Sequence, residues 1–180
     1  MAARAAICAF YTGKLRLLMK LESSETETSC KCCERLETVF AALAPLGLLL
    51  ARVALGIVFF AHGSQKLLGW FGGHGWSGTL GFMHDKLGIP AAFAALAIIA
   101  EFFGALGVLT GLLTRLAAFG IFCVMATAVF QVHLGNGFFA DKNGFEYPMT
   151  LGLIALSLVF SGAGPWSLDA LACRLCKKRK

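Results

Sequence analysis

The sequence predicts an all-α fold, a four-helix transmembrane bundle with both termini in the cytoplasm. Of the 180 residues, 58% are hydrophobic and only 14% are charged, whereas soluble domains carry about a quarter charged residues. The mean hydropathy is +0.75. Four apolar runs approach the roughly 20 residues that a helix needs to cross a bilayer. These observations predict one compact membrane domain, at 39–170, in contact with the lipid bilayer.

The four spans follow a polar, cysteine-containing extension at residues 1–38. From Met19 the extension reads MKLESSETETSCKCCERLE, a polar leader that favours translation from Met19 and would make residues 1–18 dispensable. Pro148 suits the first turn of the last helix, and GAGPW at 162–166 ends it. The predicted spans are 41–61, 91–110, 113–134 and 148–164, followed by a basic tail at 171–180.

The segment GWFGGHGWSGTLGFMHDKLGIP, residues 69–90, separates the first two spans and is rich in glycine. A phosphate-binding loop would need the G-x-x-x-x-G-K-[ST] pattern, which this segment does not contain. Trp70 and Trp76 are typical of side chains that lie at the level of lipid headgroups. The segment is therefore predicted to be a turn-rich interfacial loop.

The distribution of positive charge predicts the orientation. Twelve lysines and arginines lie in the N-terminal segment, the turn between the second and third spans, and the C-terminal tail, against three in the other loops. By the positive-inside rule, both termini then face the cytoplasm. The net charge of +6 does not indicate nucleic-acid binding, because the basic residues lie outside the apolar runs without interleaved aromatic residues.

Two ionisable residues lie near the middle of predicted spans. Arg52 is about twelfth of 21 residues in the first span, and Glu101 is about eleventh of 20 in the second. An unpaired arginine at the bilayer midplane costs roughly 2.5–3.5 kcal/mol on insertion scales. Since the two helices run antiparallel, the sequence predicts a buried Arg52–Glu101 ion pair. The pair is either a purely structural clasp or part of a binding site.

Further polar residues recur at helical spacing and predict a polar pocket inside the bundle. Thr127 and Gln131 share one helix face, and the fourth span carries Glu146, Thr150, Ser157 and Ser161 close together. A structural alternative is that the hydroxyls bond to carbonyls of the preceding turn, and that the histidines are interfacial. The predicted pair and pocket comprise Arg52, His62, Lys66, Glu101, Gln131, His133 and Glu146.

Six of the seven cysteines lie in the predicted cytoplasmic tails, where reducing conditions disfavour stable disulfides. The segments CKCC (30–33) and CRLC (173–176) offer thiolates that suit zinc or an iron–sulfur cluster. The spacing does not form a strong metal signature, and palmitoylation or free thiols are equally open. The candidate ligands are Cys30, Cys32, Cys33, Cys173 and Cys176.

Several motifs together resemble the DoxX family of small four-helix membrane proteins. The first is an arginine, Arg52, ten residues before an H-G-x-x-K segment that runs from His62 to Lys66. The others are the E-x-x-G-A segment from Glu101, the G-x-x-T-R turn at 111–115, the E-Y-P at 146–148 and the closing G-x-G-x-x-S-L-D at 162–169. The resemblance covers about residues 46–170 and implies a bundle in the cytoplasmic membrane. It assigns no catalytic role to any of these residues.

The resemblance implies a redox-associated membrane subunit, because one archaeal family member is a subunit of a thiosulfate:quinone oxidoreductase. Arg52, His62 and Lys66 suit a quinone carbonyl or a small sulfur oxyanion. No haem-attachment or dinucleotide motif is present in these residues, so an oxidoreductase activity would require a partner subunit. Two alternatives stay open: a non-catalytic membrane scaffold for soluble redox proteins, and a small transporter, which at this size would be a homodimer.

Overall fold

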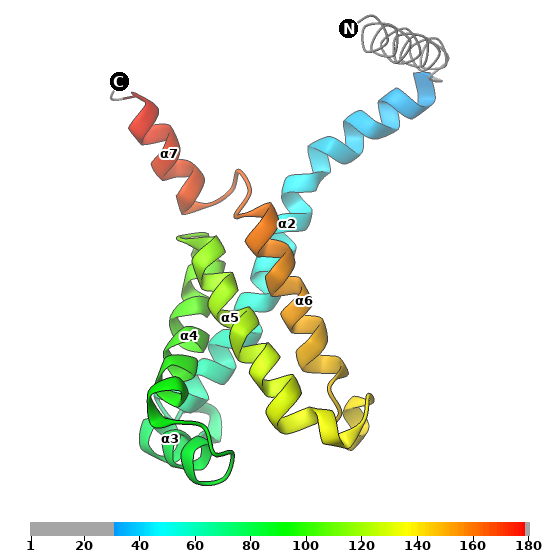
Figure 1. Cartoon of the computed structure of the whole chain (residues 1–180). Helices are drawn as coiled ribbons and strands as arrows, with labels where there is room; N and C mark the ends of the chain where they lie inside the picture. The colour runs from blue at the N-terminus through cyan, green and yellow to red at the C-terminus, as the bar shows by residue number, and fades with distance from the viewer. Residues whose placement is uncertain (1–30, 179–180) are drawn as a thin grey trace, which may run out of the picture. The chain divides into compact units, whose positions relative to one another are not determined.

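The computed structural model describes residues 31–178, and within that range every regular element is a helix, with no strand (Figure 1). The predicted dispensable segment, residues 1–18, lies outside the described residues. The chain divides into two units, Met1–Leu43 and Ala44–Lys180. The fold of the second unit, described below, contains all the side chains that form the candidate site.

Within the described part of the chain, three helical stretches are long and apolar enough to cross a membrane, namely Glu34–Leu67, Ala91–Thr110 and Thr114–Asn136. The first belongs to helix α2 (Lys31–Leu67) and the second is helix α4 (Ala91–Thr110). The third is helix α5 (Thr114–Ala128), continued by a π turn η3 (Val129–His133) and a short 3₁₀ turn η4 (Leu134–Asn136).

Helix α6 (Glu146–Ser161) is the apolar helix expected at 148–164. It has 16 residues, which at 1.5 Å per residue gives a length of about 24 Å. Gly162 ends it with a φ of +77°, a conformation that glycine adopts without steric cost. A final helix, α7 (Leu168–Lys178), follows after six residues.

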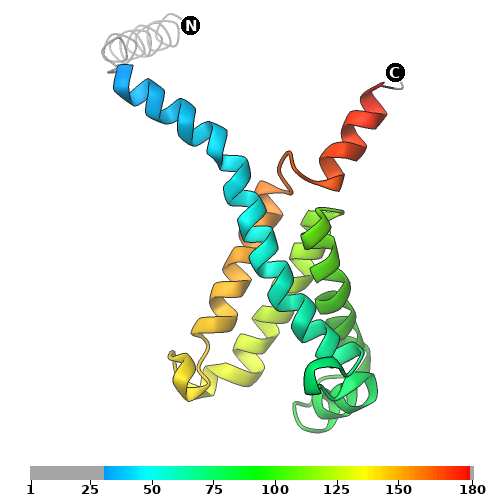
Figure 2. The ribbon, with the colours of Figure 1, turned by 180° about the vertical axis from the view of Figure 1, so that it is seen from behind.

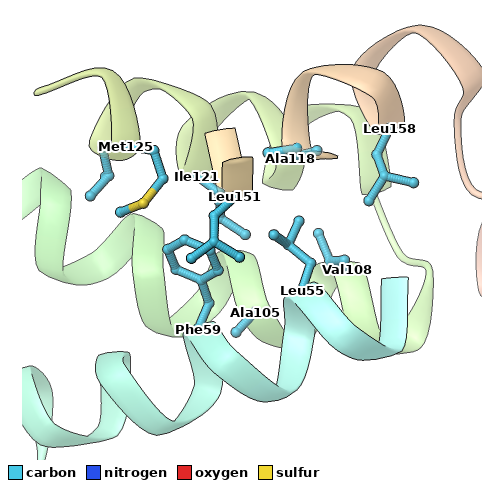
Figure 3. Packing of buried hydrophobic residues seen from close by; sticks show 11 residues of the cluster. Leu55, Phe59, Ala105, Val108, Ala118, Ile121, Met125, Leu151 and Leu158 are labelled. Carbon is cyan, nitrogen blue, oxygen red and sulfur yellow. The ribbon is translucent and has the colours of Figure 1, made fainter. Parts of the chain in front are cut away.

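One apolar core joins α2, α4, α5 and α6. Leu55 and Phe59 of α2 are almost fully buried, and Figure 3 shows them directed toward residues of the other three helices. Because the sequence predicts that these helices lie in lipid, van der Waals contacts rather than the exclusion of water hold such a core together. The core consists of Leu55, Phe59, Ala105, Val108, Ala118, Ile121, Val124, Met125, Leu151, Ala155 and Leu158.

Glycines allow α2 to approach α4 closely, as the reverse view in Figure 2 helps to follow. A Cβ atom added at Gly63 would lie 2.7 Å from the Cα of Phe102, and one at Gly56 would overlap the side chain of Leu109. Because α2 and α4 run antiparallel, these contacts fix their register. Residue 56 of α2 lies beside residue 109 of α4, and residue 63 lies beside residue 102.

The segment between α2 and α4 differs from the predicted turn-rich loop. It contains a 3₁₀ turn, η2 (Trp70–Gly72), and then an 11-residue helix, α3 (Gly75–Asp85). Its glycines would favour turns in an isolated peptide. However, α3 packs against α4 and buries Thr79, and tertiary packing of this kind overrides weak helix propensity. Trp70 and Trp76 are exposed, as side chains at a membrane interface would be.

Candidate functional site

Arg52 lies in a cage of backbone carbonyl groups. Its Nε donates to the carbonyl oxygen of Val108 at 2.9 Å, and its Nη2 donates to that of Leu109 at 2.9 Å. Its Nη1 donates to the carbonyl oxygens of Ala163 at 2.9 Å and Trp166 at 2.8 Å. Only 1% of the Arg52 residue is exposed. The guanidinium group therefore links α2, the end of α4 and the segment between α6 and α7.

The position of these carbonyls explains how a buried cation is stabilised without a carboxylate in contact. Val108 and Leu109 belong to the last turn of α4, whose carbonyls have no partner within the helix. The helix dipole also places partial negative charge at this end, where it favours a cation. Gly111 leaves the necessary room, since a Cβ atom there would lie 2.5 Å from Arg52 Nη2.

Asp169, in the first turn of α7, caps the N-terminus of α5. Its Oδ1 accepts from the backbone N–H of Leu113 at 2.8 Å, and its Oδ2 accepts from that of Thr114 at 3.0 Å. Its own backbone N–H donates to the carbonyl oxygen of Gly111 at 2.9 Å. A carboxylate at a helix N-terminus satisfies backbone donors that lack a helical partner. Asp169 thus fastens the start of α7 to the turn between α4 and α5.

The same contacts change the acidity of Asp169. Burial raises the pKa of the carboxyl group, but the hydrogen bonds from the backbone of Thr114 and Leu113 and the nearby charge of Arg52 outweigh it. The net pKa lies below the usual value of 3.8. A carboxylate with a lowered pKa in the folded state stabilises the protein at pH values above 3.8. That stabilisation is lost as the pH falls through the lowered value.

Replacing Asp169 with asparagine tests this linkage. At neutral pH the D169N variant should unfold more easily by about 1 kcal/mol, because an amide offers only one acceptor oxygen for the two backbone N–H groups and carries no charge. The difference in stability from wild type should stay constant down to about pH 5. It should shrink as the pH falls further, because wild-type Asp169 then takes up a proton and, like asparagine, carries no charge. Thermal unfolding in detergent across this pH range measures the difference. A gap that persisted unchanged to pH 2 would contradict the assignment.

Lys66, in the last turn of α2, forms an ion pair with Glu101, in the middle of α4. Lys66 Nζ lies 2.5 Å from Glu101 Oε1. The lysine side chain is 29% exposed and the glutamate side chain is 1% exposed. The second carboxylate oxygen, Oε2, is buried and has no hydrogen-bond partner among the described residues. The pair therefore combines a reachable ammonium group with a carboxylate whose remaining acceptor is free.

The predicted Arg52–Glu101 pair is wrong, because the register of α2 and α4 differs from the expected one. The prediction placed both residues at the centre of their spans. In the structure Arg52 lies beside Val108, which is seven residues past Glu101 on α4, or roughly 10 Å along the helix axis. Arg52 therefore lies level with the end of α4, and Glu101 meets Lys66 instead.

The remaining predicted residues make contacts of their own, apart from the Lys66–Glu101 pair. His62 and Gln131 are exposed on their helices. His133 bonds through Nδ1 to the carbonyl oxygen of Asn143 at 2.8 Å, and Glu146 Oε1 accepts from the backbone N–H of Ala140 at 2.8 Å. Within residues 31–178, no hydrogen bond or ion pair links these four side chains to Lys66 or Glu101. The structure therefore does not bring these four side chains into contact with the pair.

The hydroxyl groups predicted to line the bundle interior instead bond to carbonyl groups within their own helices, which was the structural alternative. The hydroxyls of Thr127, Thr150 and Ser161 donate to carbonyl oxygens four residues earlier, and that of Ser157 donates to one three residues earlier. All four residues are exposed. Such local bonds satisfy a hydroxyl group within its own helix. These residues thus need no polar partner from another helix.

The predicted metal ligands fall partly outside the described region. Cys30 and the side chains of Cys32 and Cys33 lie outside it. Cys173 and Cys176 are exposed, free thiols on α7. Among the described residues, no group of three or more histidine, cysteine, aspartate or glutamate side chains is placed to hold a metal ion.

Two residues that matter for this geometry were not among the predicted site residues. Asp169 and Gly111 both contribute to the region around Arg52, one through its carboxylate and the other through the absence of a side chain. Each belongs to a motif noted in the sequence, the closing S-L-D and the G-x-x-T-R turn respectively. The motifs therefore contained both residues. Their role around Arg52 could not be predicted, because its acceptors are backbone carbonyls, which no residue type identifies.

Comparison with known proteins gives consistent matches. The DoxX family model matches residues 47–134. An uncharacterized protein of Haemophilus influenzae is 35% identical over 132 residues, covering 69% of this chain and 90% of its own length. The inner membrane protein YqjF of Escherichia coli is 30% identical over 131 residues, covering 72% and 94% respectively. A Bacillus subtilis protein named "Putative oxidoreductase CatD" is 32% identical over 116 residues, covering 64% and 81%. No solved structure matches the chain significantly.

Proposed function

Since this chain belongs to the DoxX family of membrane proteins, we propose that it is a redox subunit that binds a quinone at Lys66 and Glu101. The observation that carries the proposal is the ion pair itself, formed between α2 and α4 at the middle of α4. Ionisable residues within membrane-spanning helices are rare and mark functional sites by default. The name of the Bacillus subtilis relative adds support for redox chemistry.

The chemistry of the pair suits a quinone better than a sulfur oxyanion. A quinone carbonyl is a neutral hydrogen-bond acceptor, and the Lys66 ammonium group is the exposed partner that can donate to it. The pair carries no net charge, because Glu101 neutralises Lys66. A sulfur oxyanion would need an excess of positive charge, which this pair does not supply. We therefore assign the site to the neutral ligand.

Reduction of a quinone to a quinol takes two electrons and two protons. Lys66 would orient the carbonyl by hydrogen bonding. Glu101 would hold the Lys66 ammonium group in place through Oε1, and both protons would come from water that reaches the partly exposed Lys66 side chain. The electrons would come from a partner subunit that carries a redox cofactor, since no haem-attachment or dinucleotide motif occurs in these 180 residues. The enzyme activity would then belong to the complex.

We further propose that α2, α4, α5 and α6 all cross the cytoplasmic membrane with both termini in the cytoplasm. The excess of lysine and arginine in the two tails and in the turn between α4 and α5 supports this orientation. In that arrangement Arg52 lies near the cytoplasmic edge of the bilayer, level with the end of α4. Lys66 and Glu101 lie deeper, where a hydrophobic quinone would reach them from the lipid.

Quinone binding by the purified protein tests the proposal. A short-chain ubiquinone should quench tryptophan fluorescence in a saturable way when titrated into wild-type protein in lipid nanodiscs. The double variant Lys66→Met, Glu101→Gln should bind about tenfold more weakly or worse, because it lacks the charged hydrogen-bonding groups. The matched control Asp141→Asn, Lys142→Met removes the same two charges from an exposed loop and should bind like wild type.

Two outcomes would contradict the quinone site. One is the absence of saturable quenching with wild-type protein, which would favour the alternative of a non-catalytic scaffold. The other is equal affinity of wild type and the Lys66, Glu101 double variant, which would place the quinone elsewhere. A circular dichroism spectrum of each variant shows whether it has kept its helical fold.

A further inference from the structure

Helix α7 has an apolar face that nothing covers within the described residues. Leu168, Leu171 and Leu175 are 43%, 50% and 59% exposed. At 100° per residue these three leucines lie within about 60° of one another around the helix. Arg174 and Lys177 lie more than about 90° from the centre of that face, and both are exposed. The helix is therefore amphipathic, with a leucine face and a basic face.

We propose that α7 lies in the headgroup region of the bilayer and binds anionic phospholipids. The leucine face would enter the boundary of the acyl chains, and the basic residues would contact lipid phosphates. A short amphipathic helix with leucine on one side and lysine or arginine on the other is typical of interfacial helices. Three further basic residues, at 178–180, follow in the sequence and increase the attraction to an anionic surface.

The connection to the rest of the bundle brings α7 to this surface. Only six residues, 162–167, separate α6 from α7, a reach of at most about 20 Å. Asp169 holds the first turn of α7 at the turn where α4 ends and α5 begins. Trp166, two residues before the start of α7, is 55% exposed. Tryptophan is a residue type that anchors at a membrane interface.

Other locations for α7 fit these features less well. The helix has 11 residues, about 16 Å of length, which is too short to cross a bilayer. A soluble acidic protein would complement the basic face but would leave the leucine face in water. A bilayer surface with anionic headgroups satisfies both faces at once. This inference does not depend on quinone binding.

Hydrogen exchange of the full-length protein in nanodiscs tests the location. We expect the amides of α7 to be protected in nanodiscs that contain phosphatidylglycerol and less protected in nanodiscs of phosphatidylcholine alone. Raising the salt concentration should reduce the protection in the anionic nanodiscs, because exposed charges are screened. The amides of α4 serve as an internal reference and should exchange equally slowly in both.

Paired variants separate the contributions of the two faces. The variant Arg174→Gln, Lys177→Gln should reduce protection in anionic nanodiscs by roughly 30-fold, since each basic residue contributes a factor of about five. The variant Leu171→Ser, Leu175→Ser should lose protection in both kinds of nanodisc. The matched control Cys173→Ser, Cys176→Ser changes two residues of the same helix outside the leucine face and should behave like wild type.

Equal exchange of α7 in anionic and neutral nanodiscs would overturn the proposal. So would protection that survives both the glutamine and the serine variants. Protection that arises only after a soluble redox partner is added, whatever the lipid, would also overturn it and would instead identify α7 as a protein-binding helix. A quinone titration that fails while α7 still responds to anionic lipid would refute the proposed function alone.

Discussion

Replacing Arg52 with methionine should lower the free energy of unfolding by about 4 kcal/mol, one of the two largest losses expected here for a single substitution. Four backbone carbonyls lose their donor at once, and each buried group left without a partner costs roughly 1–3 kcal/mol. Methionine keeps much of the side-chain volume, so the loss reports hydrogen bonding more than packing. Unfolding in mixed micelles with increasing sodium dodecyl sulfate, followed by circular dichroism, measures it.

Two further variants sharpen this result. Arg52→Lys should be intermediate, because an ammonium group has three donors at one point and does not reproduce the planar fork of a guanidinium group. Arg115→Met serves as the matched control, since Arg115 is an exposed arginine at the same end of the bundle, and should change stability by less than about 0.5 kcal/mol. Equal stability of the Arg52→Met and Arg115→Met variants would contradict the carbonyl cage.

The second large loss of stability is expected at the Lys66–Glu101 pair, and it should depend on which of the two residues is replaced. The Lys66→Met variant leaves a fully buried carboxylate with no partner and should lose about 3–5 kcal/mol. The Glu101→Gln variant leaves a lysine that is partly exposed and can extend toward the surface, so its loss should be smaller. The double variant should be more stable than Lys66→Met alone, because it no longer buries a charge.

Double-mutant cycles distinguish the observed pairing from the one expected from the sequence. Substitutions at Lys66 and Glu101 should be non-additive, since the two side chains are in contact. Substitutions at Arg52 and Glu101 should add within about 0.5 kcal/mol, because they share no partner. If Arg52→Leu instead rescued a Glu101→Ala variant, the arrangement of α2 and α4 described above would be wrong.

Hydropathy and backbone-directing residues predicted part of the fold well. The predicted span 91–110 and helix α4 have the same bounds, because Pro90 precedes the helix and Gly111 follows it with a φ of +71°. Both residues have local conformational preferences that act without tertiary contacts. Helix α2 has no such stop at its predicted end and continues to Leu67, beyond the expected residue 61.

The partners of the buried charges could not be predicted in the same way. Assigning Arg52 to Glu101 assumed that two residues at the centres of their spans meet at one depth. The register is set by packing at Gly56 and Gly63, where α2 approaches α4 closely, and apolar spans carry little information about such offsets. The acceptors of Arg52 are main-chain carbonyls, which every residue has, so no residue type marks them.

The carbonyl cage also has a consequence for biosynthesis. Arg52 bonds to Ala163, which is 111 residues further along the chain, and to Trp166 just after it. During translation the guanidinium group therefore enters the membrane long before half of its acceptors have been made. A nascent chain that stops before Gly162 therefore lacks two of the four carbonyl acceptors of this cation, and we expect it to be less stable in the membrane than the finished chain.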